Sequence, residues 1–133
     1  MATIFSKIIK GEIPCYKIAE NDNFFAFLDI RPMAKGHVLV IPKHETDYLF
    51  DLDDDVLSEM IVYSKKIAKA IQRAVPCKRI GLMVIGMEVP HAHIHLIPIN
   101  AERDMNLSNP RLKLLEDEFQ QITKDIISEL ENI

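Results

Sequence analysis

Residues 91–98 read His-Ala-His-Ile-His-Leu-Ile-Pro, so three histidines stand at alternate positions with apolar residues between them. Successive side chains of a β-strand point to opposite faces of the sheet. The spacing therefore predicts a strand that presents all three imidazoles on one face and buries the apolar side chains on the other. Because three of the chain's five histidines fall within five residues, the pattern indicates a functional site. The histidines are His91, His93 and His95.

The composition of the whole chain is that of a globular domain. The chain has 133 residues, of which 48% are hydrophobic and 27% are charged. We therefore expect a single domain over residues 1–133. The formal net charge of −4 argues against a partner that is a nucleic-acid polymer, which needs a basic surface, but allows a small nucleotide in a locally positive pocket.

The sequence predicts a cytoplasmic protein. The first residues lack a long apolar core, and nowhere do about 18 apolar residues follow one another, so neither secretion nor membrane insertion is expected. Cys15 and Cys77 form no Cys-x-x-Cys pair, so the sequence indicates neither a thiolate zinc site nor a disulfide framework.

Periodicity and turn-forming residues predict an α+β fold. The connection over 86–90 is too short for a crossover helix, so the two strands that it joins should pair antiparallel. The expected strands are 15–19, 24–28, 37–41, 79–85 and 92–97. The expected helices are 5–10, 53–75 and about 110–131.

The two long helices are predicted from apolar residues spaced three and four apart. Asp51 or Asp53 can cap the first of them, and the acidic run over 53–55 suits the positive end of a helix dipole better than a metal site. The second should begin at Asn109-Pro110, a helix cap followed by proline at the first helical position. Its apolar face is typical of core or dimer packing.

Three imidazoles on one face suit either metal binding or covalent catalysis at phosphorus. Alternate residues of a straight strand lie about 7 Å apart, so His91 and His95 are difficult to bring to one zinc ion. The run also lacks the acidic residue that two-metal hydrolases place beside their histidines. A metal hydrolase remains an alternative.

Covalent catalysis needs an imidazole with a free nitrogen, a partner that fixes its tautomer, and donors for the phosphoryl oxygens. His93 is central, so it is the predicted nucleophile, and its two neighbours are the expected support. Because the neutral imidazole attacks, activity should fall below about pH 6.5, the ordinary pKa of histidine.

Residues 91–97 resemble the His-x-His-x-His motif, with two apolar residues after it, of the histidine triad (HIT) superfamily. Residues 4–14 resemble the opening of its Hint-like branch, and residues 25–43 resemble its nucleoside-binding segment. The resemblance covers about 4–98, and the C-terminal helix matches only in kind. It implies a HIT-like fold, with a five-stranded, mainly antiparallel sheet, one long central helix and a C-terminal helix.

The resemblance also implies an activity, namely that of a nucleoside phosphoramidate or nucleotide hydrolase. His93 would attack the α-phosphorus of a nucleoside 5'-phosphoramidate or related adenylylated compound, and water would hydrolyse the resulting nucleotidyl-histidine. His91 and His95 would orient the nucleophile and contact the phosphate. The protein would be a homodimer with a purine nucleoside monophosphate pocket in each subunit, and it would need no metal and no cofactor.

Nucleotide-binding residues follow from the same resemblance. Asp29 would hold the ribose hydroxyls, and His37 would pack beside the triad. Further residues would surround the base and phosphate: Phe5, Ile8, Ile30, Gly86, Glu88 and Val89.

The chain departs from the family pattern at three places. The loop 85–90 is shorter than the family's glycine-rich loop, and Glu88 stands where a small polar residue would touch the phosphate. An ionised carboxylate there would repel an anionic substrate, so we hypothesise that Glu88 faces a cationic leaving group. Residues 3–6 read Thr-Ile-Phe-Ser in place of the zinc-binding Cys-x-x-Cys of some relatives, so that zinc is not expected. A basic residue usual after the triad is missing, and Arg103 is a candidate to replace it.

The altered loop keeps alternatives to the phosphoramidate hydrolase open. They are a nucleotide-binding or interaction protein with little turnover, a dinucleoside polyphosphate hydrolase and the metal hydrolase. The sequence does not specify the leaving group, the base preference or the rate.

Overall fold

The computed structural model describes residues 2–133. Its five strands form one sheet in the order β1-β2-β3-β5-β4. The strands are β1 (Lys17–Glu20), β2 (Phe24–Leu28), β3 (Val38–Pro42), β4 (Arg79–Met83) and β5 (Ile94–Ile99). The helices are α1 (Ile4–Ile9), α2 (Asp54–Ala74) and α3 (Glu116–Glu131), with short 3-10 turns η1 (Leu49–Asp51) and η2 (Glu102–Met105).

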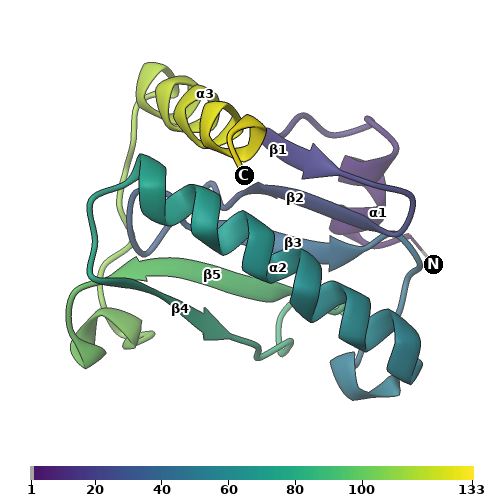
Figure 1. Cartoon of the computed structure of the whole chain (residues 1–133). Helices are drawn as coiled ribbons and strands as arrows, with labels where there is room; N and C mark the ends of the chain where they lie inside the picture. The colour runs from purple at the N-terminus through teal and green to yellow at the C-terminus, as the bar shows by residue number, and fades with distance from the viewer. Residues whose placement is uncertain (1) are drawn as a thin grey trace.

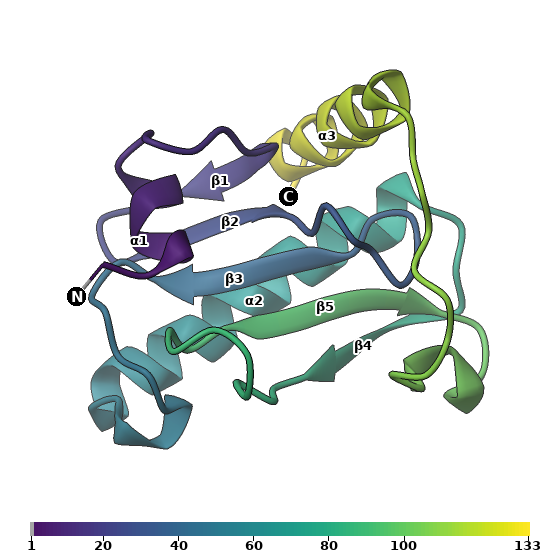
Figure 2. The same ribbon diagram turned by 180° about the vertical axis from the view of Figure 1, so that it is seen from behind.

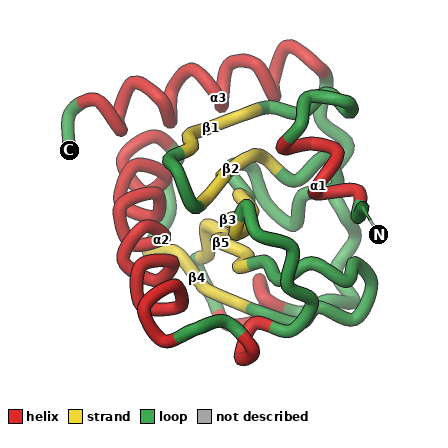
Figure 3. Tube along the Cα trace, turned by 90° about the vertical axis from the view of Figure 1, so that its right-hand side faces the viewer, coloured by secondary structure: helices red, strands yellow, loops and turns green. Residues whose placement is uncertain are grey.

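Helices cover both faces of the sheet. The long helix α2 lies across one face with α3 beside it, and α1 lies on the opposite face (Figures 1 and 2). Seen along the sheet, the strands are sandwiched between α2 and α1 (Figure 3). No helix within residues 2–133 is long and apolar enough to span a membrane. The predicted α+β class, the five strands and the long central helix are confirmed.

The sheet is antiparallel at every pairing among these strands. The β1–β2 hairpin closes because the side-chain oxygen of Asn21 accepts hydrogen bonds from the backbone N–H groups of Asn23 and Phe24, at 2.9 and 2.7 Å. Every residue of β2 and β3 is buried, because both faces of these strands are covered. The predicted antiparallel pairing of β4 and β5 is confirmed.

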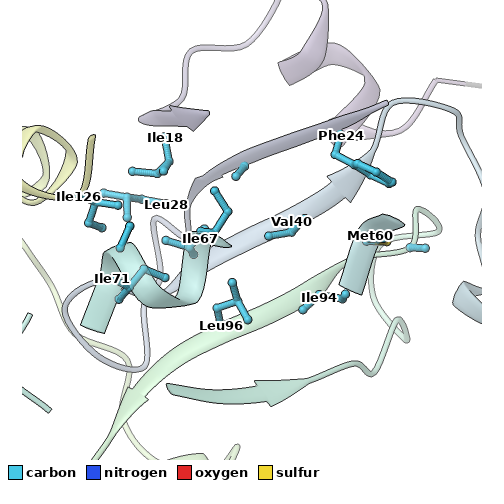
Figure 4. Close-up of a cluster of buried hydrophobic side chains, with 14 of the residues drawn as sticks. Ile18, Phe24, Leu28, Val40, Met60, Ile67, Ile71, Ile94, Leu96 and Ile126 are labelled. Carbon is cyan, nitrogen blue, oxygen red and sulfur yellow. The ribbon is translucent and has the colours of Figure 1, made fainter. Parts of the chain in front are cut away.

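The main core lies between the sheet and the two long helices (Figure 4). The apolar stripe of α2 packs on the strands, as its periodicity predicted. Asp53 occupies the N-cap position of α2, but its side chain makes no capping hydrogen bond, whereas Asp54 and Asp55 lie in the first turn. The labelled core residues in Figure 4 are Ile18, Phe24, Leu28, Val40, Met60, Ile67, Ile71, Ile94, Leu96 and Ile126.

The strand expected over 24–28 has its predicted range, and the other four differ. The strands expected over 15–19 and 37–41 span Lys17–Glu20 and Val38–Pro42, and the strand expected over 92–97 extends to Ile99. The strand expected over 92–97 begins at Ile94, because the backbone N–H of Ala92 donates to the carbonyl of Thr46 at 2.7 Å instead of to a neighbouring strand. The strand expected over 79–85 ends at Met83. The histidine run therefore spans the entry to β5, and its first two histidines lie outside the sheet ladder.

The C-terminal helix begins at Glu116, so the start predicted at Asn109-Pro110 is wrong. Asn109 closes a turn instead, since its backbone N–H donates to the carbonyl of Asn106. The backbone N–H of Leu112 then donates to the carbonyl of Pro32 at 2.9 Å, which holds the segment 110–115 outside the helix. The helix that follows packs in the core through Phe119 and Ile126.

Candidate active site

The three histidines converge on the face of the sheet that α1 covers. The ring centroids of His93 and His95 are 4.9 Å apart, and the ring of Phe5 from α1 lies edge-on to that of His93 at 5.0 Å. The intervening residues Ala92 and Ile94 belong to the core on the other face. The predicted separation of imidazoles from apolar side chains is thus present.

His93 has a defined tautomer. Its Nδ1 lies 2.7 Å from the backbone carbonyl oxygen of His91. Since a carbonyl only accepts, Nδ1 carries the hydrogen and donates it, which leaves a lone pair on Nε2 of the neutral ring. A ring held in this way has the nitrogen that an attack on phosphorus requires.

His95 is fixed by a second hydrogen-bonded chain. The backbone N–H of Met33 donates to Nδ1 of His37 at 3.0 Å, so the neutral His37 ring carries its hydrogen on Nε2. That Nε2–H donates to Nδ1 of His95 at 3.0 Å, which places the hydrogen of the neutral His95 ring on its own Nε2. His95 is therefore oriented as a donor.

Burial keeps both of these histidines neutral. It lowers the pKa of His37 to about 3 and that of His95 to about 4, and the positive charges of neighbouring groups add to the shift. The 3.6 Å approach of His37 Nε2 to a carboxylate oxygen of Asp29 is consequently not an ion pair at neutral pH.

Asp29 follows the last residue of β2 and faces this cluster. One carboxylate oxygen accepts the backbone N–H of Arg31 at 2.8 Å, and the backbone N–H of Asp29 donates to the carbonyl of His37 at 3.0 Å. Burial raises the pKa of its carboxyl group, against the opposing effects of the Arg31 N–H and of nearby positive charges. Asp29 is thus tied to the segment that carries His37.

Asp29, His37 and His95 bring three potential metal-ligand atoms within 4.8 Å of one another. Their hydrogen bonds do not suit a metal. A metal at Nε2 of His37 would need a lone pair there, which would move the ring hydrogen to Nδ1, directly against the N–H of Met33. The donor chemistry of this cluster therefore favours a proton chain over a metal centre.

His91 differs from the other two histidines because it is fully buried. Its Nε2–H donates to the carbonyl of Pro42 at 2.8 Å, and its Nδ1 lies 2.8 Å from the hydroxyl oxygen of Thr3. Both ring nitrogens are engaged within the protein, so neither is available for the phosphate contact expected from the family resemblance. His91 instead supports His93 through its backbone carbonyl.

The residues expected around the base lie in different environments. Phe5 and Ile8 are buried in a second apolar cluster between α1 and the sheet, and Val89 packs against that cluster. Ile30 is 66% exposed. In the loop before the triad, Gly86 has a φ of +74° with open space around it, and Glu88 is exposed.

The structure also brings Arg111 to the site, which the sequence did not reveal. The guanidinium of Arg111 donates to the carbonyl of Arg31 at 3.1 Å, two residues after Asp29. Figure 2 shows the segment that carries it running past the connection between β2 and β3. Arg103, considered from sequence as a basic residue for the site, is exposed on η2. The sequence analysis assigned Arg111 to a helix starting at about 110 and gave it no role in the site. No local sequence pattern indicates its contact with the distant carbonyl of Arg31.

The fold and the site define an α+β protein with a histidine triad at a central strand. The family model of the HIT domain matches residues 10–102, and the chain belongs to the HIT family. It is 36% identical to the adenosine 5'-monophosphoramidase HNT1 of Saccharomyces cerevisiae, over 98% of this chain and 84% of that protein. It is 35% identical to the adenosine 5'-monophosphoramidase hnt1 of Schizosaccharomyces pombe, over 98% of this chain and 99% of that protein.

A solved structure shares the same architecture. The HIT-like protein of Bartonella henselae, described as involved in cell-cycle regulation, superposes with a TM-score of 0.82 and 32% identity. The match covers 96% of this chain and 95% of that one. The fold predicted from the histidine run and its flanking segments is therefore confirmed.

Proposed function

We propose that the protein hydrolyses purine nucleoside 5'-phosphoramidates and related adenylylated compounds through a nucleotidyl-histidine on His93. The observation that carries this proposal is the 2.7 Å hydrogen bond from Nδ1–H of His93 to the carbonyl of His91, which leaves the lone pair of Nε2 for attack. The similarity to two yeast adenosine 5'-monophosphoramidases supports a phosphoramidate substrate with an adenosine moiety.

The reaction has two displacements at the α-phosphorus. Nε2 of His93 first attacks phosphorus, the bond from phosphorus to the amine nitrogen breaks, and the amine leaves with a proton taken from the solvent. Water then attacks the same phosphorus and loses a proton to the solvent, and the bond to His93 breaks, which releases the nucleoside monophosphate and restores the neutral ring. We assign the Nε2–H of His95 to the phosphoryl oxygens, because His95 is a neutral donor whose ring centroid is 4.9 Å from that of His93.

We assign the nucleoside to the region between Asp29 and α1. In this assignment the Asp29 carboxylate accepts hydrogen bonds from the ribose hydroxyls, and its hydrogen bond from the backbone N–H of Arg31 supports the assignment by holding it in position. Phe5 and Ile8 supply the apolar surface for the base, with Ile30 exposed at the rim. The similarity to the two yeast adenosine 5'-monophosphoramidases favours an adenine base.

A trapping experiment tests the proposal. The purified protein is mixed with an adenosine 5'-phosphoramidate, quenched early and weighed intact by mass spectrometry. We expect an acid-labile adduct of the mass of an adenylyl group, which His93→Ala abolishes. Absence of adduct and turnover, with AMP still bound, would overturn the hydrolase in favour of a binding protein.

The loop before the triad supports that second candidate, a nucleotide-binding protein with little turnover. Glu88 is exposed in this loop, and a Cβ on Gly86 would have no neighbour within 4 Å. A loop that holds the phosphate loosely lowers the rate without removing the nucleoside site. A dinucleoside polyphosphate would give the same adduct but would release a nucleotide instead of an amine.

We also propose that the protein is a homodimer joined through β4. This strand is at the edge of the sheet, and an exposed edge with apolar side chains favours pairing with another strand. Leu82 on this strand is 50% exposed, and Val84 and Ile85, which follow the strand, are 36% and 41% exposed. Sedimentation velocity should show a dimer, and Leu82→Glu should yield a monomer.

The proposed location is the cytoplasm. Cys15 and Cys77 are both free, and burial raises the pKa of each thiol, so both are poor nucleophiles that suit a reducing compartment. Cell fractionation of the natural host would test the location.

A further inference from the structure

We infer that Thr3 is a positioning residue for His93 and acts on it through His91. This inference rests on the proposed role of His93 as nucleophile. Thr3 precedes α1, and 88 positions separate it from His91, yet its hydroxyl oxygen lies 2.8 Å from Nδ1 of the His91 ring. Both residues are buried.

The direction of each hydrogen bond follows by elimination. The Pro42 carbonyl can only accept, so Nε2 of His91 must donate to it, at 2.8 Å. Burial lowers the pKa of His91, and the neutral ring then has a bare Nδ1. The Thr3 hydroxyl therefore donates to Nδ1.

The Thr3 oxygen has further partners on α1. It accepts the backbone N–H of Ser6 at 3.0 Å, which caps the helix, and it lies 3.1 Å from the Ser6 hydroxyl. Because the hydrogen of Thr3 is used on His91, the Ser6 hydroxyl donates to Thr3. One side chain thus joins the start of α1 to the His91 ring.

The His91 ring is important because the backbone around it lies outside the sheet. The last register pair between β3 and β5 is Val40 with Ile94, so residues 91–93 have no ladder partner. Backbone hydrogen bonds from His91 to Val89 and from Ala92 to Thr46 help to hold the segment. The His91 ring adds two anchors, Thr3 at the N-cap of α1 and Pro42 on β3.

Because the His91 ring is held at both nitrogens, the backbone carbonyl of His91 is also held in position, and this carbonyl contacts His93. It accepts Nδ1–H of His93 and so determines both the tautomer and the direction of the attacking Nε2. If the Thr3 hydroxyl is removed, the ring keeps one anchor and has a buried, unpaired nitrogen, so the carbonyl is held less firmly. Small misplacements of reacting groups can cost up to about a hundredfold in rate.

The test compares Thr3→Val with Thr3→Ser. Valine has the shape of threonine without the hydroxyl, whereas serine keeps the hydroxyl. We expect Thr3→Val to lower kcat, and the single-turnover rate of adenylyl adduct formation, by about tenfold to a hundredfold with KM and AMP affinity within about twofold of the wild type. Thr3→Ser should retain most of the wild-type rate.

Lys7→Gly is the matched control for weakening α1. Lys7 is exposed within α1, and glycine destabilises a helix without touching His91. This variant should lower Tm and leave kcat unchanged. A wild-type kcat in Thr3→Val, or an equal loss of kcat in Lys7→Gly, would overturn the role of Thr3.

A spectroscopic readout separates this inference from the proposed function. Long-range proton–nitrogen NMR spectra report the ring tautomers directly. We expect a single Nε2–H form of His91 and a single Nδ1–H form of His93 in the wild type, with changed nitrogen shifts of both rings in Thr3→Val. Unchanged shifts of both rings would contradict the inference. Absence of an adduct in the wild type would count against the hydrolase alone.

Discussion

Nε2 of His37 lies 3.0 Å from Nδ1 of His95, and the two rings are joined by a hydrogen bond whose direction is set by a backbone group. Because the N–H of Met33 donates to the far nitrogen of His37, that ring can only donate to His95 while it is neutral. In both neutral rings the hydrogen is therefore on Nε2 and the lone pair is on Nδ1. Protonation of either ring would add a hydrogen to Nδ1 and break the hydrogen bond that Nδ1 accepts.

We predict that the protein loses stability as the pH falls below about 6.5. An unfolded histidine has a pKa of about 6.5, whereas burial lowers the pKa of His37 to about 3 and that of His95 to about 4 in the folded protein. Below pH 6.5 the unfolded chain binds protons that the folded chain excludes, so acid favours unfolding. The loss approaches about 1.4 kcal/mol per pH unit for each such histidine. Urea unfolding at pH 7, 6 and 5 measures it.

The matched variant for this pH dependence is His37→Gln. Glutamine is uncharged in both states, so the free energy of unfolding should fall less steeply with acid, by about 1.4 kcal/mol per pH unit when His37 is fully neutral in the folded state. The quantity compared is the change in the free energy of unfolding per pH unit. A lower stability of the variant at pH 7 does not affect this quantity. Equal slopes in the two proteins would show that His37 is not held neutral.

Arg111 is predicted to support nucleotide binding. Its guanidinium donates to the Arg31 carbonyl, and Arg31 in turn donates its backbone N–H to the Asp29 carboxylate. Arg111→Met removes this anchor and a positive charge near Asp29, so the affinity for AMP should fall about threefold to thirtyfold, as for the loss of a charged hydrogen bond at the rim of a site. Isothermal titration calorimetry measures the dissociation constant.

Arg103→Met is the control for Arg111, since it removes the same charge from an exposed position on η2. It should leave AMP affinity within about twofold, because an exposed charge away from the site is screened by salt. If both variants weaken binding equally, net charge and not the contact with Arg31 is responsible.

Local patterns predicted most of the fold and the face on which the histidines lie, because alternation and helical periodicity report which face of an element is buried. They placed the histidines opposite Ala92 and Ile94, as observed. They failed at Asn109-Pro110, where a good local helix signal is overridden by the hydrogen bond of Leu112 to Pro32. Thr3 was missed for the same reason, because its bond to His91 joins distant parts of the chain.

Glu88 is predicted to set the preference among leaving groups. Its side chain is exposed in the loop just before the triad, and we expect its carboxylate to face a departing cationic amine. Glu88→Gln removes the charge at nearly constant size, so kcat/KM for a lysyl-type phosphoramidate should fall about threefold relative to that for a neutral one, as expected for a partly screened charge pair. Competition between the two substrates measures the ratio. An unchanged ratio would exclude this role for Glu88.

Gly36 is predicted to be more sensitive to substitution than Gly11, although both have positive φ values, +90° and +80°. A Cβ on Gly36 would lie 2.9 Å from a methyl group of Val75 and 3.3 Å from a ring carbon of Pro98, whereas a Cβ on Gly11 would have no neighbour within 4 Å. Gly11→Ala should therefore cost only the backbone term, about 1 kcal/mol, and Gly36→Ala about 2–4 kcal/mol, since the packed neighbours must also move. Because Gly36 directly precedes His37, its substitution should also lower kcat. Urea unfolding and steady-state kinetics on both variants measure these effects. Equal free energies of unfolding for the two variants would mean that Val75 moves aside without loss of stability.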